Sequence, residues 1–360
     1  MIIDVIFNDN GEFIRPFVID DMSSIIWSDR FNVVGDFELV LPVTETYNSI
    51  VKPGVYLEIE ESEKTMYIEN VKLESSADGN KLTAVGRSLE SILDRRILQD
   101  KVVLDGNLQK AILKLLDDNF IAPTIPERKV SNMRYVESSD KRIIELSIEQ
   151  LELMAGTTVL ENIEALCKAA NIGYKIIRDI NDFVFYLYVG TDRSYEQDTN
   201  PYVVFSKEFD NLSDSHYIHS IENYKNAVFV YANINETTSY TENIGNTSGL
   251  DRREIYVDAS SLEKEVDGVV VSEDVFRQNM INAGKQELEQ FKIDEMFEGT
   301  ADAHRPYVYG EDFFMGDIVQ IADDFGNEGI VRVSELIISH NIEGSSMYPT
   351  FETLQKEEVI

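Results

Sequence analysis

The chain has 360 residues, a length that fits two or three domains, and its 43% hydrophobic and 10% aromatic residues can form their cores. It carries 32 Lys and Arg against 66 Asp and Glu, which gives a formal net charge of −34. Nucleic-acid binding through phosphate contacts and binding to anionic membranes both need clustered cations, so the composition argues against these two classes.

The N-terminus predicts a first or edge strand. Residues 1–9 meet an acid after three apolar residues and contain neither a basic region nor a small-residue cleavage site, so they do not resemble a signal peptide. No run approaches the roughly 18 apolar residues of a membrane span. We therefore expect a chain made in a cytoplasm, without membrane insertion.

Residues 1–98 predict an N-terminal β-barrel domain. Phe37, Leu39 and Leu41 alternate as on one face of a strand, and Asp78-Gly79-Asn80 separates two further strands as a hairpin turn. A short helix near residues 88–96 closes this part, which is a small antiparallel barrel or sandwich.

Helical spacing marks residues 99–219 as an α+β middle domain. One amphipathic helix is predicted by Leu108, Ile112, Leu115 and Leu116. A second helix starts at a capping box of Thr158 and Glu161 and ends at Gly173. A β-hairpin follows, with strands at residues 174–178 and 183–189.

Residues 220–360 predict a second β-barrel domain with one long helix, at residues 273–291 after a Ser272 cap. Its strands are predicted at residues 228–232, 253–257, 318–322 and 329–339. Polar residues 233–250 predict an exposed, mobile loop or hairpin tip. Strand-like segments follow a Gly-Asp pair in both β-rich parts, at Gly35-Asp36 and Gly316-Asp317, and we expect two similar small barrels.

Cysteine and histidine give little sign of a functional site. The single cysteine, Cys167, excludes an internal disulfide and lies in an apolar helical stripe, so it predicts a buried structural thiol. His216 and His219 suit two metal ligands on a helix, but their neighbours favour a strand, where this spacing puts them on opposite faces. His304 and His340 are isolated.

Other chemical signatures are also weak. Acidic pairs such as Asp117-Asp118, Asp323-Asp324 and Glu357-Glu358 are expected in so acidic a chain, and residues 323–328 favour a hairpin turn over a calcium loop. Arg252-Arg253 favours ion pairs over an anion site. Because no phosphate loop, nucleophile elbow or zinc motif occurs, we predict no enzyme, no catalytic, cofactor-binding or metal residues, and no cofactor.

Several blocks together resemble a family of siphophage and prophage minor tail proteins. They are residues 27–42, 88–96, 190–194, 223–230, 249–259 and 309–319. The blocks occur in the same order as in the family and together extend over nearly the whole chain.

The resemblance implies a tail-associated baseplate hub at the virion tail tip, synthesised in the host bacterial cytoplasm. Its fold would be α+β and β-rich, with two small antiparallel β-barrel domains around an α+β middle domain. Three chains would form a homotrimer that adapts a sixfold tube to a threefold tip. Implied partners are a distal tail or tube protein, a tape-measure protein and a receptor-binding protein, with DNA passing through the lumen unbound. Because the chain stops after residues 354–360, adsorption or hydrolysis is not carried over.

Alternatives remain open at this point. The acidic charge can line a channel that repels DNA, or it can serve solubility alone. The 17 tyrosines and the polar residues 233–250 also suit a carbohydrate- or receptor-binding module of the tail tip. A cell-wall hydrolase is a third possibility.

Overall fold

The computed structural model describes residues 1–9, 11–76, 79–235, 237–262, 265–266, 269–301 and 306–354. Contacts divide the chain into two units, one of Met1–Ser215 with Glu298–Glu352, and one of His216–Phe297 with Thr353–Ile360. This grouping differs from the three consecutive domains predicted from the sequence, which stay a prediction. Strands β14 (Leu212–Ser220) and β20 (Asp294–Ala301) pair with each other, and each contains a boundary between the units.

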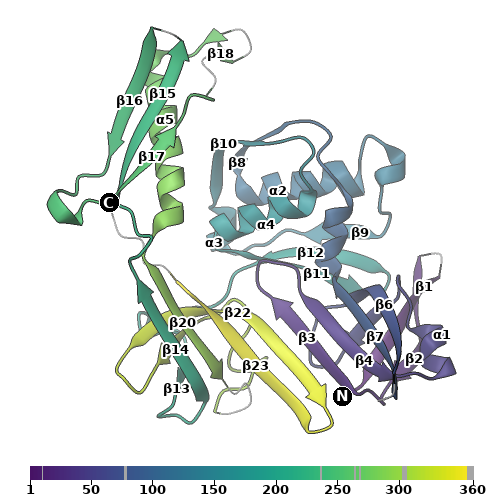
Figure 1. Ribbon diagram of the computed structural model, residues 1–360. Helices are drawn as coiled ribbons and strands as arrows, with labels where there is room; N and C mark the ends of the chain where they lie inside the picture. Colours follow the sequence, from purple (N-terminus) through teal and green to yellow (C-terminus); the bar gives the residue numbers. More distant parts are fainter. Residues whose placement is uncertain are drawn as a thin grey trace. The chain divides into compact units, whose positions relative to one another are not determined.

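A large, mainly antiparallel sheet dominates the first unit (Figure 1). Among the described residues it has eleven strands: β1 (Ile3–Asp9), β2 (Glu12–Ile19), β3 (Ser24–Arg30), β4 (Asp36–Pro42), β5 (Tyr56–Ile59), β6 (Met66–Ser76), β7 (Gly79–Ser88), β13 (Val204–Ser206), β21 (Ile318–Ala322), β22 (Glu328–Asn341) and β23 (Gly344–Thr353). The order is β13-β21-β22-β3-β4-β7-β6-β5-β1-β2, with β23 paired to β22. The first strand is therefore an interior strand, because β1 lies between β5 and β2.

The two ends of the chain share this sheet. Strand β22 pairs antiparallel with β3, from Glu335 opposite Arg30 to Asn341 opposite Ser24. The strands expected in two separate barrels are thus hydrogen-bonded into one sheet. The strand-rich α+β class predicted from the sequence is confirmed, while closure of either end into a barrel stays a prediction.

Alternating burial is clearest in β4 and in the second half of β7. Phe37, Leu39 and Leu41 of β4 are buried as expected. In β21, Val319 and Ile321 are buried, whereas Ile318 is only partly buried. The turn between β21 and β22 is the predicted hairpin, in which the Asp323 carboxylate accepts hydrogen bonds from the backbone of Phe325 and Asn327.

The middle of the first unit combines short helices with small sheets. Its elements are the 3₁₀ helix η1 (Leu89–Arg95), β8 (Val102–Asn107), α2 (Leu108–Leu116), the π-helical turn η2 (Asp117–Ile121), the 3₁₀ turn η3 (Pro126–Arg128), β9 (Met133–Val136), α3 (Lys141–Ile144), β10 (Ser147–Leu153), α4 (Val159–Ala169), β11 (Gly173–Asp179) and β12 (Asp182–Tyr188). A further helix, α1 (Glu45–Ile50), connects β4 to β5. One core cluster joins η1, α2 and α4 to β11 and β12.

Local signals for these elements were largely correct. The capping box of Thr158 and Glu161 starts α4, and β11 and β12 form the predicted hairpin. Gly173 does not end the helix. Asn171 takes the left-handed conformation there, with φ of 54°, and Gly173 opens β11 where a Cβ would lie 2.5 Å from the Phe31 ring.

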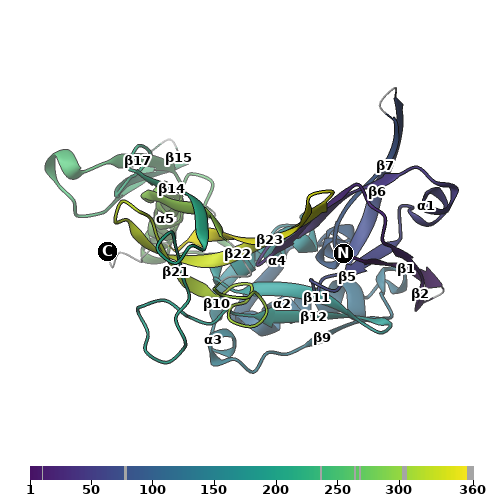
Figure 2. The same ribbon diagram turned by 90° about the horizontal axis from the view of Figure 1, so that it is seen from below.

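The second unit has a three-stranded sheet against a helix. Strands β16 (Thr238–Ile244), β15 (Ala227–Asn235) and β17 (Glu254–Asp258) lie in that order, and α5 (Glu273–Leu288) packs on one face (Figures 1 and 2). The 3₁₀ turns η4 (Gly249–Asp251) and η5 (Glu289–Phe291) and the short pair β18 (Glu265–Val266) and β19 (Val269–Val270) complete it. The expected loop at residues 233–250 is wrong in part, because β16 pairs with β15 and alternates between partial burial and exposure.

No helix within the described ranges is long and apolar enough to cross a membrane.

Candidate functional site

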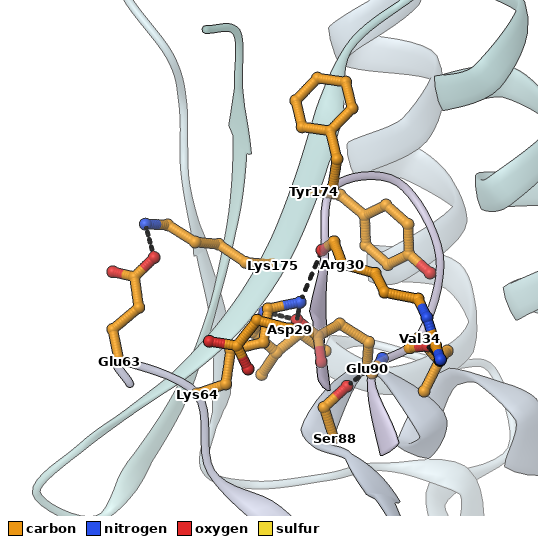
Figure 3. Close-up of polar contacts among 12 residues, drawn as sticks. Asp29, Arg30, Val34, Glu63, Lys64, Ser88, Glu90, Tyr174 and Lys175 are labelled. Carbon is orange, nitrogen blue, oxygen red and sulfur yellow. Dashed lines mark hydrogen bonds and ion pairs between the residues drawn. The ribbon is translucent and has the colours of Figure 1, made fainter. Parts of the chain in front are cut away.

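The first unit buries three ionisable side chains close together, which we call the charge cluster: Asp29, Lys64 and Glu90. They come from β3, the segment before β6, and η1. The Lys64 ammonium lies 3.0 Å from Glu90 Oε1, and both side chains are at most 3% exposed (Figure 3). Charged side chains are rarely buried unless they are paired, so this cluster requires partners for its polar atoms.

Hydrogen bonds supply most of those partners. Asp29 accepts from Trp27 Nε1 at 3.0 Å and from the Ser62 hydroxyl at 2.6 Å. Lys64 Nζ donates to the Arg30 carbonyl at 3.0 Å. The cluster therefore ties β3 to the segment before β6 and, through Lys64, to η1.

Glu90 extends the network to the middle of the unit. Its Oε1 also accepts from the backbone N–H of Ile176 in β11, at 3.2 Å. Its Oε2 is buried without a hydrogen-bond partner among the described residues. A buried carboxylate oxygen without a hydrogen-bond partner lowers the stability of the folded state. The ion pair between Lys64 and the other oxygen of Glu90 offsets part of this loss.

Burial raises the pKa of Asp29 to about 6, although the nearby Lys64 ammonium and the hydrogen bonds from Ser62 and Trp27 lower it. Desolvation disfavours the charged carboxylate more than these contacts favour it. Perturbed carboxyl groups often mark active sites, but such groups must also reach a substrate. Asp29 is 5% exposed and Glu90 is fully buried, so both carboxyl groups lie in the packing between segments.

A second junction connects the middle of the first unit to its C-terminal strands. The buried Asp317 carboxylate lies 2.7 Å from Arg193 Nε and accepts from the backbone N–H of Thr191 at 2.6 Å. A Cβ on Gly190 would lie 1.8 Å from the Gly316 carbonyl oxygen. Glycine at position 190 is thus required by the close approach of two backbones.

The Phe31 ring completes this junction. A Cβ on Gly316 would lie 2.4 Å from the ring, and the Arg332 guanidinium lies over it at 4.9 Å from its centroid. Sequence blocks 27–42, 190–194 and 309–319 therefore meet at one place. Blocks 27–42 and 88–96 likewise meet in the charge cluster, through Asp29 and Glu90.

The structure places each candidate residue from the sequence in a defined environment. Cys167 is fully buried, and burial raises its thiol pKa. His216 and His219 lie on strand β14, and the described residues include no group of His, Cys, Asp or Glu suited to a metal. Arg252 pairs with Glu254 at 2.6 Å, as favoured above.

The two isolated histidines and two of the acidic pairs lie in different parts of the chain. His340 Nδ1 lies 2.7 Å from the Ser345 hydroxyl. Asp118 forms an ion pair with Lys114 on the helical surface. His304 and the Glu357-Glu358 pair lie outside the described residues.

Sequence reasoning missed the charge cluster. The sequence contains 66 acidic residues, and no spacing rule distinguishes Asp29 and Glu90 from the solvated ones. The available signal was modest: Glu90 lies among apolar residues in the segment Leu89–Arg95, where five of the seven side chains are buried.

Comparisons with known proteins agree on one class. The family described as "Siphovirus ReqiPepy6 Gp37-like protein" matches residues 4–351. No curated protein matches the sequence.

Solved structures share the fold at low sequence identity. A tail protein from Neisseria meningitidis has a TM-score of 0.58 and 13% identity, over 97% of this chain and 96% of that one. The 43 kDa tail protein of prophage MuSo2 from Shewanella oneidensis has a TM-score of 0.57 and 12% identity, over 97% and 98%. The prophage tail protein gp18 from Listeria monocytogenes has a TM-score of 0.52 and 12% identity, over 99% and 95%.

Proposed function

The chain belongs to the family of siphovirus ReqiPepy6 Gp37-like proteins and is a structural protein of a phage tail, and from this premise we propose that it is the trimeric hub of the tail tip. Three copies would form a ring that closes or extends the tail tube. Each copy would present two β-rich parts, so that a threefold ring meets a sixfold tube.

The observation that supports subunit assembly most directly is the apolar surface of edge strand β2. This strand ends the order of the large sheet, and three of its apolar side chains are 43–54% exposed: Ile14, Phe17 and Val18. Exposed apolar groups on an unpaired edge favour contact with another chain. We assign this contact to a second copy of the protein, because a closed ring requires two different surfaces of one chain to meet.

The charge cluster suits this role. Forces on a tail component must pass between its segments, and the ion pair and hydrogen bonds of this cluster connect three of those segments. The proposed partners are a distal tail or tube protein, a tape-measure protein and a receptor-binding protein at the tail tip. DNA would pass through the ring unbound, since acidic walls do not retain phosphate.

We also propose that the protein has no enzymatic activity. Asp29, Glu90 and Asp317 are each at most 5% exposed, so none of these three carboxylates is open to a polymer substrate. Incubation of the purified chain with peptidoglycan and host polysaccharide should give no cleavage. Cleavage that a single carboxylate substitution abolishes would contradict this proposal.

The ring is tested with a matched pair of variants. Phe17→Asp adds a charge at the β2 edge, and Phe325→Asp adds the same charge at the exposed turn between β21 and β22. Sedimentation should show trimers for the wild type and for Phe325→Asp, and weaker association for Phe17→Asp.

If the isolated chain stays monomeric at every concentration, reconstruction of assembled tail tips decides the question. Three copies around the tail axis support the hub. One or six copies, or a dimer in solution with the same effect of both variants, would contradict it.

A further inference from the structure

The second unit exposes a row of aromatic rings on the face of its sheet opposite α5. Phe229 and Tyr231 of β15 and Tyr256 of β17 point away from the core, which takes their neighbours Val228 and Val230 instead. Tyr256 is 60% exposed and Phe229 is 36% exposed. We call Phe229, Tyr231 and Tyr256 the aromatic face.

These rings are nearly parallel but overlap little. The centroids of Phe229 and Tyr256 are 6.1 Å apart at an interplanar angle of 26°, and those of Tyr231 and Tyr256 are 6.5 Å apart at 27°. Offset-stacked rings overlap more at centroid distances near about 4.5 Å. At the larger distances observed, the rings do not cover one another fully, and Tyr256 and Phe229 keep surface exposed to solvent.

Hydrogen-bonding side chains flank the rings on both sides. On β16, the exposed Asn243 and Thr241 stand opposite Phe229 and Tyr231. On β17, Glu254 and Asp258 are exposed on either side of Tyr256. Glu254 pairs with Arg252 and Asp258 accepts hydrogen bonds from Ser260, so a ligand would use their remaining acceptor capacity. Amide, hydroxyl and carboxylate groups are thus arranged within reach of a ligand lying on the rings.

The composition of this face indicates the class of ligand. Its described side chains combine the three rings with hydroxyl, amide and carboxylate groups and include no Leu, Ile, Val or Met. Pyranose rings offer C–H faces for aromatic packing and hydroxyls for amides and carboxylates. Glu254 is neutralised by Arg252, but Asp258 and the net charge of −34 disfavour anionic sugars.

We propose that the aromatic face binds an uncharged glycan. The site lies wholly within the second unit, and its function does not depend on the trimeric ring.

The test uses the full chain and four soluble probes. Maltohexaose, cellohexaose and chitohexaose are uncharged, and a hyaluronan hexasaccharide is acidic. Saturation-transfer NMR should detect binding of at least one uncharged probe and weaker binding of the acidic one. The ring signals of Tyr and Phe in the wild type should shift on binding.

Variants locate the site. Phe229→Ser with Tyr256→Ser should weaken binding at least about tenfold, because both packing surfaces are lost. The control, Tyr195→Ser with Tyr202→Ser, removes another pair of exposed rings in contact and should bind normally. Tyr256→Phe keeps the ring and should also bind.

Three outcomes would overturn the proposal. They are an absence of binding to all three uncharged probes, binding of the acidic probe with equal or greater affinity, and equal loss of binding in the control variant. If the Phe229 and Tyr256 variant loses self-association while no probe binds, the face is a protein contact instead.

Discussion

Lys64 lies in the interior of the first unit, where its side chain forms an ion pair with Glu90 and donates a hydrogen bond to the Arg30 carbonyl. Removing one partner of such a pair leaves the other charge buried, and the cost exceeds the net gain from forming the pair. The environment of a single ammonium group therefore decides whether β3, η1 and β11 can pack as observed.

Lys64→Met should lower the free energy of unfolding by about 3–5 kcal/mol, because Glu90 is left buried without its ion-pair partner. Lys114→Met is the control, since Lys114 forms its ion pair on the surface with a side chain that is 63% exposed. That change should cost less than about 1 kcal/mol. Urea denaturation measures both, and similar losses would show that the Lys64 pair is not buried in solution.

Asp29 should make stability depend on pH in a direction unusual for a carboxyl group. Its folded pKa, about 6, lies above the ordinary value of 3.8, so the folded state binds the proton more tightly. The resulting stabilisation is complete below about pH 4 and is lost as pH rises through 6.

Asp29→Asn removes this dependence while keeping an acceptor for Trp27. Relative to the wild type, the variant should gain roughly 2.4 kcal/mol in free energy of unfolding between pH 4 and pH 7. Denaturation across this range tests the difference, which cancels contributions from other groups. A difference that stays constant with pH would contradict the raised pKa.

At the scale of elements, β22 and the segment after β12 decide how the C-terminal strands join the first unit. Strand β22 pairs along half its length with β21 and along the other half with β3. The backbone contact between Gly190 and Gly316 positions the start of β21 next to Phe31. Both joints depend on residues more than 120 positions apart in the sequence, so loop closure makes them entropically costly to form.

Gly190→Ala should lower the free energy of unfolding by about 2–3 kcal/mol or more, since a Cβ there meets backbone that cannot rotate away. Gly326→Ala is the control: it has φ of +87° in open space, so it tests conformational strain alone and should cost about 1 kcal/mol. Thermal and urea denaturation measure both. Equal losses would show that the two backbones do not approach so closely.

At the scale of the whole molecule, net charge opposes assembly. Three chains of charge −34 repel one another, and the repulsion extends over a Debye length of about 30 Å at 0.01 M salt but about 10 Å at 0.1 M. Association through the β2 edge then competes with this repulsion.

Self-association should therefore strengthen as salt rises from low to moderate concentration. Sedimentation at several salt concentrations measures it, and Phe325→Asp should show the same trend as the wild type because it leaves the β2 edge unchanged. Association that is constant or weakens with salt would mean that cross-chain ion pairs hold the copies together.

Much of the fold could be predicted from the sequence, because local chemistry determines it. Alternation placed Phe37, Leu39 and Leu41 in the core, the Thr158 and Glu161 box started α4, and block order indicated a phage tail protein. The alternation and the capping box act over a few residues, so they can be recognised without the tertiary structure.

Tertiary structure alone decided the rest. Strand β3 pairs with one strand on each side, and its sequence does not predict that one of these partners is β22, about 300 residues later. Which of the 66 acidic residues are buried depends on the cations that folding brings near them, as Lys64 lies near Glu90 and Arg193 near Asp317. Likewise, the polar residues 238–244 become a strand because β15 offers them a pairing edge and α5 covers their inner face. Strand pairing, burial and desolvation are properties of the folded chain, and they cannot be predicted from single residues.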